Sequence, residues 1–480
     1  MALTCGVPQE SILGPLLFNL YLLPLAEAAT SSRSERRTNT TTTCGVRMEA
    51  VAALLLSLLL CSLPGHSGAQ VGSFFLDLTQ GFSSLLPSLS RPANHSRIRY
   101  AVMFDAGSTG TRIHVYTFIQ SDTDKLPVLD NEMFQSIKPG LSAYVDSPEM
   151  AGHTVRMLLK VAKRTVPRVE WKRTAVILRA TAGLRLLPKQ KAQALLEQVQ
   201  HVFDESPFLV PDDSVSIMDG TNEGILAWIT LNFLTGHLSP QSHKTVGILD
   251  LGGGSTQITF LPKLKKTIET VPSPDYIARF DMFNSSFELY TYSYLGNGLM
   301  AARLAVLGAQ GAQGLDWQIF KSSCLPKKFR DEWSFGGQTY QVSGDPDGSS
   351  GFKSCYQEVL KAVKGNIHQP HELQDSSTFY AFSYYFDRAV DAGLIDGDQG
   401  GRLEVRDFKK RAKEICNKMS SSPPSGPFLC LDLTYITALL KDGFGFKETT
   451  ALQLTKKVKN VEASWALGAA LDHFHKLKLH

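Results

Sequence analysis

The amino-acid sequence predicts an α/β protein organised around two similar β-hairpins. Residues 101–118 and 246–260 share one plan: a short apolar run ends in an Asp, a turn rich in Gly, Ser and Thr follows, and apolar and polar residues then alternate as in a returning strand. Around these hairpins, segments with helical spacing alternate with segments that have the composition of buried strands. This order of elements is typical of α/β folds.

The length and composition are those of a folded protein with a large core. A chain of 480 residues has room for two or three domains, and 43% hydrophobic with 20% charged residues is a globular composition. The formal net charge of +4 is small for this length, and no basic run with interleaved aromatic residues occurs. We therefore expect no nucleic-acid partner.

The first 47 residues differ from the rest of the chain. Residues 6–18 resemble a reverse-transcriptase segment of non-LTR retroelements, and residues 31–43 are rich in Ser, Thr and Arg without an apolar period, as in disordered segments. We interpret residues 1–47 as a disordered gene-model artefact.

Residues 48–69 have the pattern of a signal peptide. An apolar run over residues 50–61 precedes small residues that suit cleavage before Gln70. The alternative is a membrane anchor, but the run is short for a span and soon meets Pro64 and Gly65. We expect a protein of the endoplasmic reticulum lumen or a secreted one, without stable membrane insertion after cleavage.

The remaining cysteines agree with an oxidising compartment. Four cysteines follow the signal peptide, and an even number is typical of disulfide-bonded proteins. Three pairings are possible, and a zinc site is the alternative, although the CxxC spacing of such sites is missing. The four are Cys324, Cys355, Cys416 and Cys430. In this compartment the sequons at Asn94 and Asn284 are candidate glycosylation sites.

Between the hairpins, periodicity predicts two helices and two strands. Apolar residues at helical spacing indicate helices over residues 150–166 and 192–203, whereas residues 174–180 and 215–218 have the composition of buried strands. A turn over residues 220–224 then opens an apolar helix that ends at residue 234.

The second hairpin begins a second sheet, and the chain closes with a predicted helix. That helix runs through Val461, Trp465, Leu467 and Leu471. Apart from the paired hairpins we find no internal repeat and no long linker.

The two hairpin turns have the composition of phosphate-binding loops. Glycines let successive backbone N–H groups point at one anion, and hydroxyl groups add further donors. Asp105 and Asp250, at the strand ends, are candidate ligands of a divalent cation. Either turn alone is better explained as an ordinary glycine-containing hairpin, but two copies in one chain favour the functional interpretation. The candidate phosphate-binding residues are Ser108, Thr109, Gly252, Gly253 and Gly254.

Five segments in order resemble the signature regions of the apyrase family, the ectonucleoside triphosphate diphosphohydrolases, and most closely its soluble endoplasmic-reticulum uridine diphosphatase branch. They are residues 105–112 (DAGSTGTR), 180–185, 220–224, 250–257 and 379–385. The resemblance implies two ribonuclease-H-like α/β domains of the actin, hexokinase and heat-shock chaperone superfamily, with an interdomain cleft. We expect the first domain at 98–219 plus 461–480 and the second at 220–460. The resemblance also implies disulfide bridges between Cys324 and Cys355 and between Cys416 and Cys430, the pairing that closes the shortest loops.

The resemblance assigns further site residues. It makes Glu223 the general base, with Ser255 and Gln257 orienting the attacking water, and Thr181 part of the catalytic centre. From the residues alone, Glu223 is equally compatible with a helix-terminal carboxylate and Arg185 with a structural ion pair.

The remaining assignments concern the cation, the nucleobase and the substrate. The cation implied is Ca²⁺ or Mg²⁺, bound at Asp105 and Asp250, while Tyr384 or Tyr385 is either a nucleobase contact or part of the core. The implied reaction is hydrolysis of UDP or GDP to the monophosphate and phosphate by a monomer that supports glycosylation and folding quality control. Alternatives are a phosphotransferase or polyphosphate hydrolase of the same superfamily, and a non-catalytic nucleotide-binding protein.

Overall fold

The protein is described from a computed structural model. It describes residues 97–477 apart from 122–125, 239–243, 283–284, 313–317, 366, 375–377 and 420–425. The expectations for residues 1–69, Asn94 and Asn284 lie outside these residues. Within them, we find no helix that is both long and apolar enough to cross a membrane.

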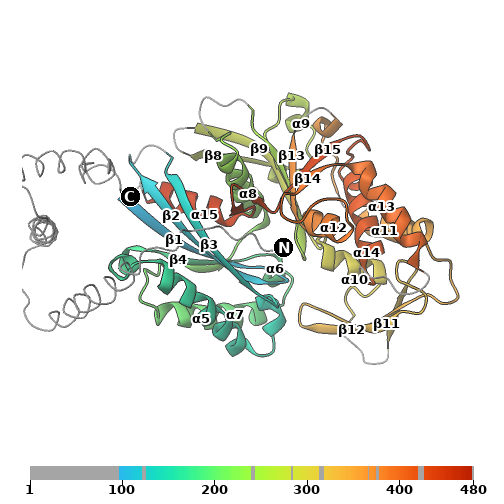
Figure 1. The fold of residues 1–480 in the computed structure, drawn as a ribbon, viewed down its shortest axis with the longest axis horizontal. Helices are drawn as coiled ribbons and strands as arrows, with labels where there is room; N and C mark the ends of the chain where they lie inside the picture. Colours follow the sequence, from blue (N-terminus) through green and yellow to red (C-terminus); the bar gives the residue numbers. More distant parts are fainter. Residues whose placement is uncertain are drawn as a thin grey trace, which may run out of the picture. The chain divides into compact units, whose positions relative to one another are not determined.

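The first hairpin belongs to a five-stranded mixed sheet with the order β3-β2-β1-β4-β5 (Figure 1). Its strands β1 and β2 pair over their full length in antiparallel register, and β4 and β5 continue the sheet in parallel on the other side of β1. The predicted strands at 174–180 and 215–218 are confirmed as β4 and β5. The strands are β1 (Arg97–Ala106), β2 (Thr111–Gln120), β3 (Val128–Ile137), β4 (Val176–Ala180) and β5 (Val215–Ile217).

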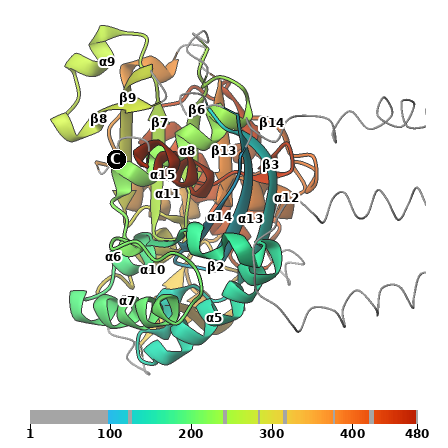
Figure 2. The same ribbon diagram turned by 90° about the vertical axis from the view of Figure 1, so that its left-hand side faces the viewer.

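Alternate residues of β1 point into two different cores. Val102 and Phe104 join the core under helices α5 (Pro148–Thr165) and α7 (Lys189–Asp204), while Met103 joins the core of the opposite face. This is the period of two that a strand buried on both faces requires. Both helices predicted from apolar spacing are confirmed, and they lie side by side on this face (Figure 2).

The second hairpin belongs to a seven-stranded sheet with the order β14-β15-β13-β6-β7-β9-β8. Its central strands β6 and β13 are parallel, so their carboxyl ends meet at one edge. The strands are β6 (Gly247–Leu251), β7 (Ser255–Phe260), β8 (Ile277–Met282), β9 (Ser285–Leu295), β13 (Phe379–Ser383), β14 (Gly401–Glu404) and β15 (Ala451–Leu454).

Helices cover both faces of this sheet. The single helix α8 (Gly220–Leu234) lies against β6, β7 and β9 on one face, and five helices build the larger core on the other. Those five are α10 (Leu299–Leu307), α11 (Phe352–Val363), α12 (Tyr384–Asp391), α13 (Val405–Asn417) and α14 (Leu429–Ala438), the last continued by a π-helical turn at Leu439–Gly443.

Shorter elements complete the described chain. They are α6 (Ala182–Arg185), α9 (Lys265–Glu269), a small sheet of β10 (Ile319–Ser322), β12 (Gln338–Gly344) and β11 (Arg330–Phe335), and the hairpin of β16 (Lys457–Val458) and β17 (Val461–Glu462).

The final helix, α15 (Ala466–Lys476), joins the two halves. It packs on β1 and β2 of the first sheet and against α8, which itself covers the second sheet (Figure 1). The two helices approach closely at Gly468, where a Cβ atom would lie 2.0 Å from the backbone oxygen of Leu226. Gly468 N also donates to Thr230 Oγ1 at 2.8 Å.

The predicted start of this last helix was wrong. Val461 lies in β17, and the helix begins only after Trp465. Lys459 and Asn460 adopt positive φ values in the turn between β16 and β17, so the chain forms a hairpin there before it can enter a helix.

Both disulfides have the expected pairing. Cys324 is bonded to Cys355 and Cys416 to Cys430, with sequence separations of 31 and 14 residues. All four cysteines are buried in the core of the second half.

Candidate active site

The turns of the two predicted hairpins meet in space. A Cβ atom at Gly253 would lie 2.3 Å from Ser108 Oγ, and one at Gly183 would lie 2.7 Å from Ser108 Cα. Any side chain at these two glycines would therefore push the loops apart. The turns border a cavity of about 410 Å³, whose lining includes Asp105, Ser108, Thr109, Thr181, Glu223, Asp250, Gly252, Gly253, Ser383 and Tyr384.

The two hairpins place an acidic residue at equivalent positions. Asp105 lies next to the last residue of β1 and is paired with Arg112 on β2. Asp250 lies next to the last residue of β6 and is paired with Gln257 on β7. Both carboxylates are nearly buried, with 6% and 7% of their residue surface exposed. The cavity therefore contains two acidic groups that come from different sheets.

Each of these carboxylates keeps one oxygen without a partner. Asp105 Oδ2 accepts a hydrogen bond from Arg112 Nη1 at 2.7 Å, but Oδ1 of Asp105 and Oδ1 of Asp250 have no hydrogen-bond partner among the described residues. Leaving a buried carboxylate oxygen unpaired is costly. Two such oxygens suit a hard divalent cation, so the residues present fit Ca²⁺ or Mg²⁺.

Burial shifts the protonation of Asp250. It raises the pKa of Asp250 to about 6, and the nearby charge of Asp105 adds to this rise. Hydrogen bonding from the Ser383 side chain and the charge of Arg112 act in the opposite direction.

Glu223 reaches the same cavity from the first turn of α8. The helix begins at the N-cap Asp219, whose Oδ1 accepts from Thr221 N at 2.8 Å and from Asn222 N at 3.2 Å. Glu223 is 7% exposed and forms an ion pair with Arg185. Arg185 is thus an ion-pair residue, as one of the two sequence-based interpretations held, but its partner is the candidate base.

Burial dominates the protonation of Glu223. It raises the pKa of Glu223 to about 8, and the charges of Asp250 and Asp105 add to this rise. The positive charge of Arg185 opposes this rise without cancelling it, because the Glu223 carboxylate is removed from water and lies near two other carboxylates. A carboxyl group with such a pKa can exchange a proton near neutral pH.

A model of the GDA1/CD39 (nucleoside phosphatase) family matches residues 91–480. The chain belongs to the GDA1/CD39 family. The match includes both hairpins and all five segments on which the sequence-based resemblance depended.

Individual relatives agree with this assignment. The chain is 60% identical over 398 residues to ectonucleoside triphosphate diphosphohydrolase 5 of Gallus gallus. The aligned region covers 83% of this chain and 92% of that protein. It is 55% identical over 419 residues to nucleoside diphosphate phosphatase ENTPD5 of Homo sapiens, with 87% and 95% covered.

A solved structure shares the fold. It is the crystal structure of nucleoside triphosphate hydrolases from Neospora caninum, with a TM-score of 0.59 at 15% identity over 85% of this chain and 97% of that one. Together with the family match, this likeness confirms the predicted α/β fold with two ribonuclease-H-like domains.

The remaining predicted site residues of this family member lie in two layers. Thr181 lines the cavity directly after β4, whereas Ser255 and Gln257 are almost completely buried beneath it. Gln257 Nε2 donates to Ser255 Oγ and to Ser293 Oγ, both at 2.8 Å. Gly254 packs behind the turn, where a Cβ atom would lie 2.9 Å from Ala182 Cβ.

The structure separates the two candidate nucleobase residues. Tyr385 is 0% exposed and belongs to the core of the second half, so it does not line the cavity. Tyr384 is partly exposed at the cavity, with Arg388 Cζ 5.6 Å from the centre of its ring. They are adjacent on α12, and only one of two neighbouring positions can face the core.

Two residues near the carboxylates received no role from sequence reasoning. Arg112 could have been noticed, because a hairpin with a four-residue turn places it opposite Asp105. Ser383 carried no such signal, because its importance depends on a backbone conformation that residue type does not indicate.

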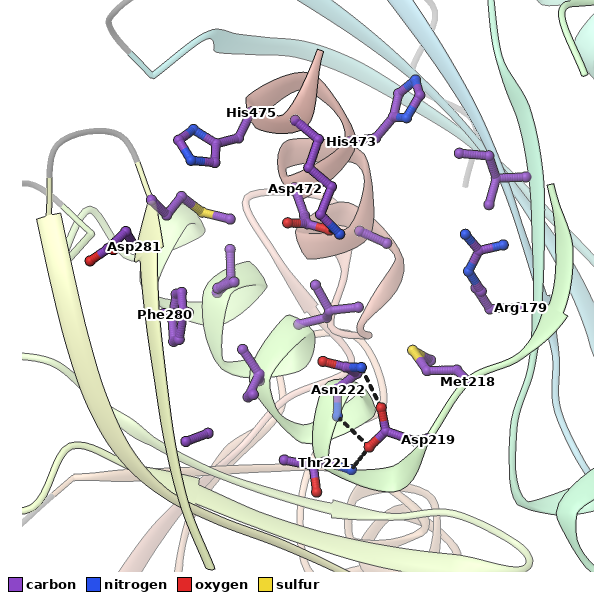
Figure 3. A pocket seen from close by; sticks show the side chains of 18 of the residues that line it. Arg179, Met218, Asp219, Thr221, Asn222, Phe280, Asp281, Asp472, His473 and His475 are labelled. Carbon is purple, nitrogen blue, oxygen red and sulfur yellow. Dashed lines mark hydrogen bonds and ion pairs between the residues drawn. The ribbon is translucent and has the colours of Figure 1, made fainter. Parts of the chain in front are cut away.

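A larger cavity, of about 1430 Å³, lies outside this site (Figure 3). It is bordered by β5, β8, α8 and α15, and Figure 3 shows Asp219 bonded to Thr221 and Asn222 at its lower end. None of the predicted catalytic, phosphate-binding or metal-binding residues lines it. The first turn of α8 contributes Glu223 to the smaller cavity and Thr221 and Asn222 to this one.

Proposed function

We propose that the protein hydrolyses nucleoside diphosphates to the monophosphate and inorganic phosphate in a reaction that requires a divalent cation. The observation that carries this proposal is the convergence of Asp105, Asp250 and Glu223 from three elements on one cavity between two glycine-rich turns. Membership of a nucleoside phosphatase family supports it, and so does the name of the human relative, a nucleoside diphosphate phosphatase.

The phosphate groups bind between the two turns in this proposal. Ser108 and Thr109 supply hydroxyl groups, and the backbone N–H groups of Gly253 and Gly254 supply further donors. Gly252 lines the cavity, but its N–H already donates to Ser255 O at 3.0 Å. Asp105 and Asp250 hold Ca²⁺ or Mg²⁺. When bound, such a cation neutralises phosphate charge that would otherwise repel the nucleophile.

Glu223 accepts the proton of the attacking water. Its raised pKa suits a base that works near neutral pH, and Arg185 fixes its carboxylate. Ser255 and Gln257 orient the water, and Thr181 helps to align it. The water attacks the terminal phosphorus in line, so we propose no covalent intermediate.

Tyr384 is the proposed nucleobase contact, and UDP and GDP are the proposed substrates. We further propose a monomer that is glycosylated and acts in the endoplasmic reticulum lumen or after secretion, where removal of nucleoside diphosphates supports sugar transfer and folding quality control. The domain boundaries proposed are 98–219 plus 461–480 and 220–460.

A phosphate-release assay tests this function. Purified protein is given nucleoside mono-, di- and triphosphates and polyphosphate, with Mg²⁺, with Ca²⁺ and with EDTA. We expect release from UDP and GDP in either cation and none in EDTA. Preferred release from polyphosphate would indicate a polyphosphate hydrolase, and nucleotide binding without release would indicate a non-catalytic protein.

A further inference from the structure

Ser383 connects β13 to α12 in a sharp turn without an intervening residue. Its backbone angles are φ 56° and ψ −127°. In the described part of the chain, the other non-glycine residues with positive φ are Lys459 and Asn460, which form the two-residue turn of a hairpin. A residue with a Cβ atom is strained in this region, and such strain persists where the surrounding structure imposes it.

The turn at Ser383 presents its side chain at the end of the sheet. A strand-to-helix turn of this kind lifts a serine hydroxyl clear of the sheet in hydrolases with a nucleophile elbow. Here Ser383 is exposed and lines the catalytic cavity, whereas its neighbours Phe382 and Tyr385 are buried. The strained conformation thus exposes one hydroxyl in a segment whose other residues are buried or partly buried.

Ser383 and Asp250 lie near the ends of neighbouring strands. Strands β13 and β6 are parallel neighbours, with Phe382 in register with Asp250 and Ser383 in register with Leu251. Both residues line the same cavity, which brings the Ser383 side chain within reach of the Asp250 carboxylate. Oδ1 of Asp250 still has no hydrogen-bond partner among the described residues.

A comparison of the two hairpins explains why Asp250 needs this contact. In the first hairpin, Asp105 is held by Arg112, the residue opposite it in the register. In the second hairpin the opposite residue is Gln257, and both protons of its amide nitrogen are used by Ser255 and Ser293. Gln257 therefore has no donor left for Asp250.

We propose that Ser383 is a positioning residue for Asp250. The turn between β13 and α12 holds its hydroxyl against this carboxylate, as Arg112 holds Asp105, and so fixes the acceptor that the proposed function assigns to the divalent cation. The proposal rests on that assignment of Asp250. Ser383 itself does not attack phosphorus.

Two substitutions separate the hydroxyl from the backbone strain. Ser383→Ala removes the hydroxyl and keeps the Cβ atom, whereas Ser383→Gly removes both and relieves the strain. Asn460→Gly is the control, because it relieves positive φ at a turn outside the site. Cation binding is measured directly by EPR titration with Mn²⁺, in the presence of α,β-methylene-UDP, a nucleotide that is not hydrolysed.

We expect both Ser383 variants to bind Mn²⁺ about 10-fold more weakly than the unmodified protein, the loss expected for one hydrogen bond to a charged group. The cation concentration at half-maximal phosphate release should rise similarly, with little change in KM for the nucleotide. Ser383→Gly should have a melting temperature at or above that of the unmodified protein. Asn460→Gly should bind Mn²⁺ normally.

Normal Mn²⁺ binding by folded Ser383→Ala or Ser383→Gly would overturn the proposal. Should Ser383→Ala fail to fold, the glycine variant still decides, because its backbone is relaxed. Failure of the proposed function looks different. If only the proposed function is wrong, the Ser383 variants still bind Mn²⁺ more weakly than the unmodified protein, but the unmodified protein releases no phosphate from any nucleotide.

Discussion

At the scale of single residues, the site depends on how buried charges are compensated. Asp105 has Arg112 and Glu223 has Arg185, both within ion-pair distance. Asp250 has no such arginine pairing and, with Glu223, has a raised pKa. The carboxylates thus carry an excess of negative charge, which favours cation binding and proton uptake.

Replacing Glu223 by Gln should remove turnover and keep binding. The amide preserves size and hydrogen bonding but cannot accept the proton from water, so we expect kcat to fall by about 10²–10⁴-fold with little change in nucleotide affinity. Glu149→Gln, in the first turn of α5 and far from the cavity, is the matched control. Near-normal hydrolysis by folded Glu223→Gln would return Glu223 to the role of a helix-terminal carboxylate.

The raised pKa of Glu223 also predicts a pH dependence of stability. The pKa rises from 4.5 to about 8 on folding, so the stabilising contribution is fully present below pH 4.5 and is lost as the pH rises through 8. The free energy of unfolding of the unmodified protein relative to Glu223→Gln should therefore decrease over this range, by up to about 1.4 kcal/mol per pH unit.

Urea unfolding in EDTA between pH 4.5 and 8 measures this difference. EDTA keeps divalent cations from the nearby carboxylates. Parallel stability curves for the two proteins would show that Glu223 titrates normally in the folded protein.

At the scale of elements, the contact between α8 and α15 links the two sheets. Helices α8 and α15 are far apart in the described chain, and each covers one sheet. Their separation depends on Gly468, which leaves room for the backbone of Leu226 and bonds to Thr230. The position of Glu223 on α8 therefore depends on a helix more than two hundred residues away.

Gly468→Ala should destabilise the protein. The new methyl group would meet the Leu226 backbone oxygen at 2.0 Å, so the helices must move apart, at a cost of about 1–3 kcal/mol in the free energy of unfolding. Gly152→Ala in α5 is the control, because its methyl group would find ordinary contacts at 3.5 Å and stabilise the helix by about 0.5–1 kcal/mol. Urea unfolding compares them, and equal stability of both variants would contradict the close packing of α8 and α15.

At the scale of the whole molecule, the cavity is shared by the two sheets. Ser108 and Asp105 come from the first sheet, and Gly253 and Asp250 come from the second. A ligand held by both turns therefore stabilises the arrangement of the two halves in addition to each hairpin.

Ligands should accordingly raise the melting temperature. A cation together with α,β-methylene-UDP at 100 times the dissociation constant should stabilise the folded protein by about 2.7 kcal/mol. Differential scanning calorimetry measures the shift, and Asp250→Asn should reduce it because one cation ligand is weakened. A shift of equal size in Asp250→Asn would argue against Asp250 as a cation ligand.

The sequence by itself determined the local elements and the residue types of the site. The repeated hairpins and the helices α5 and α7 follow from short-range patterns, because periods of two and 3.6 residues report which face of an element is buried. Asp105 and Asp250 could be selected from the composition of their turns, whereas the role of Glu223 and the pairing of the four cysteines were predicted from the resemblance to the apyrase family.

Only the tertiary structure decided how these elements meet. It brought Arg185 to Glu223, buried Tyr385 while leaving Tyr384 at the cavity, started the last helix after Trp465 instead of at Val461, and set the backbone of Ser383. Each of these depends on contacts between segments far apart in the chain. Local periodicity carries no information about such contacts, because burial and charge pairing at one residue are set by whichever distant segment packs against it.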